Sequence, residues 1–70
     1  MDNPIYKKIE LTGSSDKSIE DAVNNALNKA AQTVRKMRWL EVVEIRGAIE
    51  DDHVDQWQVT VKVGFRLEDE

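Results

Sequence analysis

The chain has 70 residues, of which 40% are hydrophobic and 34% charged, and it contains no cysteine. A chain of about 60 residues buries only roughly 60% of its unfolded surface, so residues 1–70 are expected to form one small domain that is marginally stable alone. The absence of cysteine excludes disulfides, thiolate metal sites and cysteine nucleophiles. With these excluded, association between chains is the remaining way for so small a domain to gain stability.

The charge pattern excludes two classes of partner. A formal net charge of -4, with Lys and Arg dispersed along the chain, argues against a surface that binds nucleic acid. No apolar run approaches the roughly 20 residues of a membrane helix, and no signal-peptide pattern opens the chain. We therefore expect a cytoplasmic protein with no nucleic-acid partner and no membrane partner.

The first half of the chain predicts a strand followed by a helix. Residues 5–12 alternate apolar and polar side chains with one exception, as a half-buried strand does, and residues 13–16 are rich in turn formers. Ser18 and Asp21 then resemble a capping box. Spacings of three and four predict an amphipathic helix with this apolar stripe: Ile19, Ala22, Val23, Ala26, Leu27, Ala30, Val34 and Met37.

The second half of the chain predicts a β-hairpin. Residues 39–50 are rich in Val and Ile, with Gly47 as a bulge or a point of close approach, and residues 51–53 are turn formers. Residues 68–70 are a charged end that we expect to be solvated. The last strand alternates, and its buried face should carry Trp57, Val59, Val61, Val63, Phe65 and Leu67.

The order β-α-β-β predicts an α+β fold. A right-handed crossover makes the first two strands parallel, and a third strand inserted between them makes every neighbouring pair antiparallel. One helix covers only one face of such a three-stranded sheet. The apolar residues left uncovered would be Trp39, Leu40, Val42 and Ala48. Exposed patches of this kind mark interfaces, so we expect association with copies of the same chain.

Trp39, at the junction of helix and strand, and Gln58, on the last strand, are the first candidates for a binding site. Trp39 either packs in a core or an interface, or stacks on a planar ligand, which is worth about 1–3 kcal/mol for a nucleobase. Gln58 is either solvated or uses the adjacent donor and acceptor of its amide on a ligand. That pair matches the imide-like edge of a flavin, and also other planar heterocycles.

The hairpin sets the distance between these two candidates. If the chain turns at residues 51–53, Gln58 lies opposite Arg46, and Trp39 lies seven residues further along the strand. At about 3.3 Å per residue the separation is roughly 23 Å. One flavin ring does not span that distance, so a ligand shared by Trp39 and Gln58 must lie between different chains.

Arg46 and Glu44 share the face of Gln58 under strict alternation. They form either an exposed charge pair of small energetic value or, for Arg46, a contact to a ligand phosphate. His53 lies in a polar turn without a second ligand at metal spacing, and we expect it to be exposed. The sequence contains no nucleophile with an evident base and no Gly-rich phosphate loop, so no catalytic residue and no metal ligand are nominated.

Several segments together resemble the dodecin family along nearly the whole chain. The most specific is residues 38–47, which read RWLEVVEIRG, and Gln58 with Val59 adds to it. Trp57 departs from the Tyr of many members. The remaining matches are residues 6–11 (YKKIEL), 13–15 (GSS), 20–23 (EDAV) and 63–67 (VGFRL).

The resemblance implies a hollow homododecamer in which a three-stranded antiparallel sheet partly wraps the helix. It implies that flavin, as riboflavin or FMN, binds at subunit contacts, with Trp39 stacked on the ring and Gln58 hydrogen-bonded to it. Arg46 matches a position that is basic in only some members, and Glu44 is implied to lie near the ligand. The expected function is storage of flavin and quenching of its photochemistry, because an indole donates electrons readily to a photoexcited flavin. Two alternatives stay open: an oligomeric scaffold for another planar metabolite, and a flavoenzyme.

Overall fold

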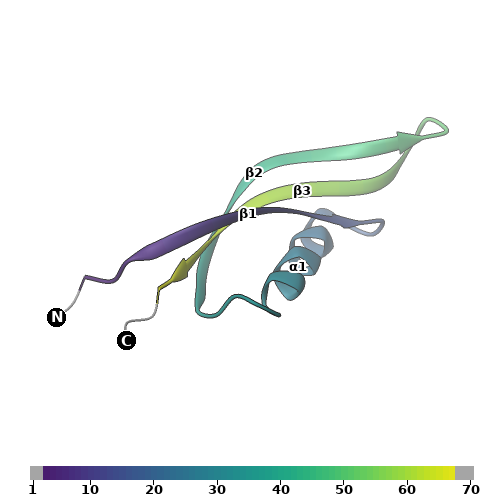
Figure 1. Cartoon of the computed structure of the whole chain (residues 1–70). Helices are drawn as coiled ribbons and strands as arrows, with labels where there is room; N and C mark the ends of the chain where they lie inside the picture. The colour runs from purple at the N-terminus through teal and green to yellow at the C-terminus, as the bar shows by residue number, and fades with distance from the viewer. Residues whose placement is uncertain (1–2, 68–70) are drawn as a thin grey trace.

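The structure is a computed structural model that describes residues 3–67, so the charged end at residues 68–70 lies outside the described part. The strands form one antiparallel sheet in the order β1-β3-β2, and α1 lies against one of its faces (Figure 1). The α+β class, the β-α-β-β order and the central place of the last strand are confirmed. The elements are β1 (Tyr6–Ser15), α1 (Ile19–Ala30), β2 (Met37–Glu50) and β3 (His53–Arg66).

β1 is longer than the predicted strand at residues 5–12. Gly13 pairs with Val59, and Ser15 pairs with Trp57, so the prediction of a turn from residue 13 was wrong. A Cβ at Gly13 would clash with the backbone of the first helical turns, at the carbonyl oxygen of Ala22. The small residues therefore serve the close approach of helix and strand rather than a turn.

α1 begins at the predicted cap. The Ser18 hydroxyl accepts a hydrogen bond from the backbone N–H of Asp21 at 2.9 Å, which satisfies one of the free donors of the first turn. The Asp21 carboxylate does not complete a capping box. It accepts from the Ser15 hydroxyl at 2.7 Å and so ties the start of the helix to the end of β1.

The core lies between α1 and the central strand β3. Val59, Val61 and Val63 have no exposed surface, as the alternation of the last strand predicted. Trp57 and Phe65, expected on the same buried face, are half-buried, whereas Leu67 lies beyond β3 and is 41% exposed. The valines pack against Ala22 of α1, and Ala26 and Ala30 of the same helix are also buried. Small side chains of this kind let the helix approach the sheet closely.

α1 ends at Ala30, and the predicted continuation to Met37 was wrong. The Ala30 carbonyl accepts hydrogen bonds from the backbone N–H groups of Thr33 at 3.1 Å and Val34 at 2.8 Å, which form a closing turn. Lys36 then takes a left-handed φ of 61°, and the chain turns into β2. Met37 still packs against the core, but it does so from the sheet, so its apolar spacing continued while the helix did not.

The β2–β3 hairpin closes through a two-residue turn. Asp51 and Asp52 have positive φ values of 53° and 65°, as a type I′ turn requires at both positions. His53 pairs with Glu50 and is the first residue of β3. The predicted turn is therefore confirmed, except that its last residue belongs to the strand, and His53 is exposed as expected.

Gly47 is not a point of close approach. A Cβ at Gly47 would make ordinary contact with the Trp57 ring at 3.5 Å, and the nearest register shift lies between Ala48 and Ile49. The glycine that a neighbouring ring requires on this hairpin is Gly64 instead, because a Cβ there would clash with Trp39.

The isolated subunit is elongated and leaves much of β2 uncovered. Its principal extents are 55 × 20 × 13 Å and its radius of gyration is 14.6 Å, whereas a compact chain of this length has about 11 Å. α1 lies against β1 and β3. Of the residues predicted to remain uncovered, Leu40 and Ala48 are half-buried. The exposed large apolar side chains of β2 are Trp39, Val42, Val43, Ile45 and Ile49.

Candidate ligand-binding face

The face of the sheet opposite α1 carries the candidate residues. Alternation points the even-numbered residues of β3 away from the buried valines, toward the side that no helix covers (Figure 1). Their partners on β2 include three of the candidates, in the pairs Trp39 with Gly64, Glu44 with Thr60, and Arg46 with Gln58. All four candidate residues therefore share one open face of the sheet.

The Trp39 indole lies flat across the neighbouring strand. A Cβ at Gly64 would clash with three carbons of the indole, so only glycine lets the ring lie this close to β3. Tyr6 of β1 meets the same indole edge to face, with ring centroids 5.0 Å apart and ring planes at 68°, which is a favoured aromatic geometry. Trp39 remains 40% exposed, so it is not buried inside its own fold.

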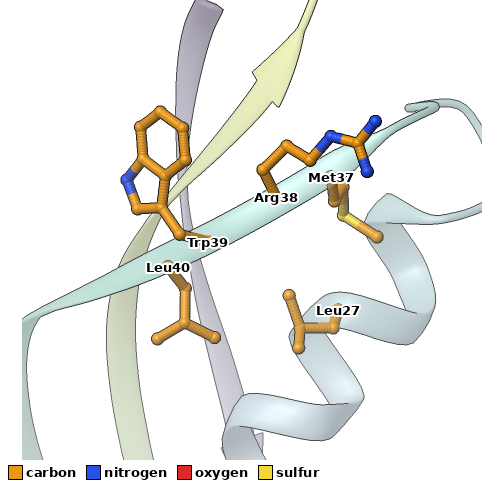
Figure 2. Close-up of a pocket in the computed structure, with 5 residues that line it drawn as sticks. All are labelled: Leu27, Met37, Arg38, Trp39 and Leu40. Carbon is orange, nitrogen blue, oxygen red and sulfur yellow. The ribbon is translucent and has the colours of Figure 1, made fainter.

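Figure 2 shows the residues that line a hollow beside Trp39, which lie on both sides of β2. Leu40 and Leu27 lie on the helix side of the strand, and the indole of Trp39 projects to the opposite side. Met37 and Arg38 complete the lining of this hollow. Leu27 and Leu40 form its apolar wall between α1 and β2, and Trp39 borders it from the helix-free side of the strand.

The Gln58 amide is held by two neighbours. Arg46, its direct cross-strand partner, donates from Nε to Gln58 Oε1 at 2.7 Å. Gln58 Nε2 in turn donates to Gln56 Oε1 at 3.2 Å. Gln58 is half-buried, so it is not a freely solvated glutamine. Oε1 keeps a second lone pair and Nε2 keeps a second N–H, which leaves one acceptor and one donor for a ligand.

Glu44 takes the place on this face that strict alternation predicted, although the register of β2 shifts between Val42 and Glu44. It lies opposite Thr60, whose hydroxyl is hydrogen-bonded to the Thr12 hydroxyl at 2.7 Å. Arg46 directs its Nε to Gln58 rather than to Glu44. The charge pair considered from the sequence is therefore replaced by a bond between guanidinium and amide.

Trp39 and Gln58 lie far apart within one subunit. The partner of Trp39 is Gly64, which is six positions from Gln58 on β3, and six positions of a strand span about 20 Å. This separation agrees with the distance expected from the hairpin. The two side chains reach a common ring only if they come from different chains.

Between these two ends the face is charged. Lys8 Nζ and Glu41 Oε1 form an ion pair at 2.8 Å, with both side chains about half exposed. The hydrogen bond from Lys8 and its positive charge lower the pKa of Glu41, and the charge of Lys62 acts in the same direction. Solvent screens an exposed pair of this kind, so its contribution to stability is small.

Between residues 3 and 67, no group of three or more His, Asp or Glu side chains is placed to hold a metal ion. In the same range, no helix combines the length and the apolar character needed to cross a bilayer. The groups that this face offers to a ligand are therefore an indole, an amide and charged side chains.

Three residues that shape this face were not nominated from the sequence, namely Tyr6, Gln56 and Gly64. Tyr6 carried a signal, because it is the one aromatic residue on the otherwise polar parity of the first strand. Gln56 and Gly64 carried none. Gln56 acts through a side-chain hydrogen bond to Gln58 within β3. The role of Gly64 depends on the register between β2 and β3, which shifts between Ala48 and Ile49 and between Val42 and Glu44 and is not readable from the residue types.

Together these features define a class of protein: a thin α+β subunit that presents an exposed indole and an oriented amide on an open sheet. Residues 5–68 match the family model of dodecin. A dodecin from Thermus thermophilus is 48% identical over 65 residues, which are 93% of this chain and 94% of that protein. The chain therefore belongs to the dodecin family of small flavin-binding proteins.

Solved structures agree with this membership and with the fold. The structure of dodecin from Streptomyces coelicolor has a TM-score of 0.93 and 47% sequence identity, and the match covers 100% of both chains. Dodecin from Streptomyces davaonensis has a TM-score of 0.93 and 41% identity over 97% of this chain and 100% of that one. The three-stranded sheet with one helix is thus the shared fold.

Proposed function

We propose that this protein binds flavin, as riboflavin or FMN, at the contacts between its subunits, stores it, and quenches its photochemistry without catalysing a reaction. In this proposal residues 1–70 form one domain, and the subunits assemble into a hollow dodecamer in the cytoplasm. The observation that carries the proposal is the Trp39 indole, which lies flat against Gly64 and keeps 40% of its surface exposed on the helix-free face.

The side chains of this face have the chemistry that a flavin requires. Trp39 offers a broad, electron-rich π surface for stacking. The Gln58 amide offers one donor and one acceptor side by side, which suit the pyrimidine edge of the ring. Arg46 lies beside the Gln58 amide and donates to it through Nε, and Glu44 lies two residues before Arg46 on the same face. A bound flavin would supply a planar ring whose photoexcited state is a strong oxidant, and Trp39 is the adjacent electron donor.

Self-association follows from the same geometry. Trp39 and Gln58 are about 20 Å apart within one chain, and β2 leaves large apolar side chains exposed beside Trp39. Burying apolar surface between copies is worth about 25 cal/mol per Å² before the entropy of association is subtracted. Membership of the dodecin family supports this association. The proposed site is complete only after assembly.

The proposal is tested by titrating riboflavin or FMN with the purified protein and with its two tryptophan variants. The wild-type protein should quench flavin fluorescence. Trp39→Ala should lower the affinity by roughly 5- to 150-fold, which corresponds to about 1–3 kcal/mol of stacking, and flavin that is still bound should regain fluorescence. Trp57→Phe is the matched control, because Trp57 faces Gly47 and Ser15 across the sheet and should leave quenching unchanged.

The alternatives have distinct outcomes in the same experiment. Full quenching by Trp39→Ala would remove the role of the indole. A wild-type protein that stays colourless after incubation with flavin would favour a scaffold for another planar metabolite. Turnover of a substrate by the flavin-loaded protein would favour a flavoenzyme.

A further inference from the structure

The contact between Arg46 and Gln58 has a fixed polarity. A guanidinium carries only donors, so the atom of the Gln58 amide that faces it must be the oxygen, and the two lie 2.7 Å apart. The nitrogen of the amide then faces Gln56 Oε1 at 3.2 Å. Two neighbours thus decide between the two amide orientations, which are otherwise nearly equal in energy for a glutamine in water.

This orientation decides what the amide can recognise. Arg46 holds Oε1 and Gln56 holds Nε2. The positions of the remaining acceptor lone pair and the remaining N–H donor are therefore fixed. An amide of fixed orientation binds an imide-like edge with less loss of side-chain entropy than a freely rotating one, because immobilising such a side chain costs about 0.5–1.5 kcal/mol. The positive charge of the Arg46 guanidinium beside Oε1 also polarises the amide and strengthens its N–H as a donor.

We propose that Arg46 is a positioning residue that orients the Gln58 amide for the ring of the ligand, and that it does so whether or not the ligand carries a phosphate. This inference rests on the proposed function and deepens it. It differs from a phosphate contact, which would involve the terminal nitrogens of Arg46 and would matter for FMN alone. Here Nε is the atom engaged. The orienting contact is made within the chain itself, so it exists before any ligand binds.

The two roles separate when riboflavin and FMN are compared. We expect Arg46→Ala to lower the affinity for riboflavin and for FMN by the same factor, roughly tenfold, because a hydrogen bond to a charged group is lost from a half-buried amide. In a Gln58→Ala background, Arg46→Ala should cause no further loss of riboflavin affinity, as expected of two residues that act through one contact. Lys29→Ala removes the same charge from the exposed face of α1 and is the matched control.

Each outcome has one meaning. Loss of FMN affinity with unchanged riboflavin affinity would overturn the inference and leave Arg46 as a phosphate ligand. An equal loss of riboflavin affinity with and without Gln58 would overturn it as well. A wild-type protein that binds neither flavin would overturn the proposed function, and the inference with it.

A readout without ligand guards against a variant that merely misfolds. Arg46→Ala should keep the mass and the far-ultraviolet circular dichroism of the wild-type protein. In its crystal structure the Gln58 amide should leave the orientation that it has beside Arg46. An amide that keeps this orientation without the guanidinium would contradict the positioning role.

Discussion

Val61 on β3 and Val42 on β2 are direct cross-strand partners, yet Val61 has no exposed surface and Val42 is 51% exposed. The residue type and the side of the sheet are the same. The difference is α1, which lies against β1 and β3 and ends at Ala30. The chain therefore covers the β1 and β3 part of this sheet face by itself and leaves Val42 of β2 open on the same face, which another copy would cover in the proposed assembly.

The largest effect is expected from Val61→Asp. A carboxylate at this fully buried position would have no partner and no water, and burying an unpaired charge costs more than about 4 kcal/mol. That is a large part of the stability of a small domain, which is about 5–15 kcal/mol. We expect the cooperative thermal transition in far-ultraviolet circular dichroism to disappear. A cooperative transition near the wild-type temperature would show that Val61 is not enclosed as described.

The same substitution at its partner, Val42→Asp, should act on assembly and not on the subunit. Val42 is half exposed within the chain, so the new carboxylate stays hydrated there, and surface changes usually alter stability by less than about 0.5 kcal/mol. In an interface between copies it would be buried without a partner. Light scattering should therefore report a lower particle mass with secondary structure retained. An unchanged mass would place the contact between copies elsewhere.

A smaller effect is expected from Gly64→Ala, which tests the seat of the indole. The new Cβ clashes with Trp39, and overpacking of this kind costs about 1–3 kcal/mol. The indole must leave the sheet, so the near-ultraviolet circular dichroism should change and flavin quenching should fall. Gly47→Ala is the control, because its Cβ would only touch the Trp57 ring at 3.5 Å. Equal effects of the two substitutions would argue against a special seat at Gly64.

The smallest effect is expected at the exposed ion pair of Lys8 and Glu41. Lys8 lowers the pKa of Glu41 in the folded chain, so this pair stabilises the fold above the ordinary pKa of a glutamate, and the stabilisation is lost as the pH falls through the lowered value. The wild-type protein should lose stability at acid pH in part because Glu41 becomes protonated. In Lys8→Met this contribution of Glu41 should be absent. Melting temperatures of both proteins between about pH 3 and pH 6 measure this difference, and identical curves would show that the pair contributes nothing.

The part of the sheet that α1 covers could be predicted from the sequence more completely than the open face. The alternation of the last strand predicted the buried valines, and the apolar spacing predicted the alanine stripe of α1, because both are periodic. The predicted pairing of Arg46 with Gln58 is confirmed. The observed turn is one residue shorter than the predicted one, and the register shift between Ala48 and Ile49 makes up the difference. The end of α1 did not follow, since the apolar spacing continues to Met37 while the backbone turns at Lys36.

The open face required information that periodicity does not hold. The place of Trp39 opposite Gly64 depends on two register shifts between the turn and Trp39, one between Ala48 and Ile49 and one between Val42 and Glu44. Such shifts leave no trace in residue types. The hydrogen bond from Arg46 to Gln58 depends on side-chain orientation. Residue chemistry nominated Trp39 and Gln58 but left a packing role and a solvated role open, and the resemblance to the dodecin family favoured ligand binding. The structure adds the contacts that hold both side chains.

The central claim is that the indole and the amide of one site come from different chains. Equal amounts of Trp39→Ala and Gln58→Ala subunits, unfolded together and refolded as mixed assemblies, test it directly through quenching of riboflavin fluorescence. Neither variant alone should bind tightly. With random mixing, about a quarter of the sites in a symmetric assembly would receive Trp39 from one chain and Gln58 from its neighbour, and about that share of tight, quenched binding should return. Mixed assemblies that bind no better than either variant alone would contradict the account.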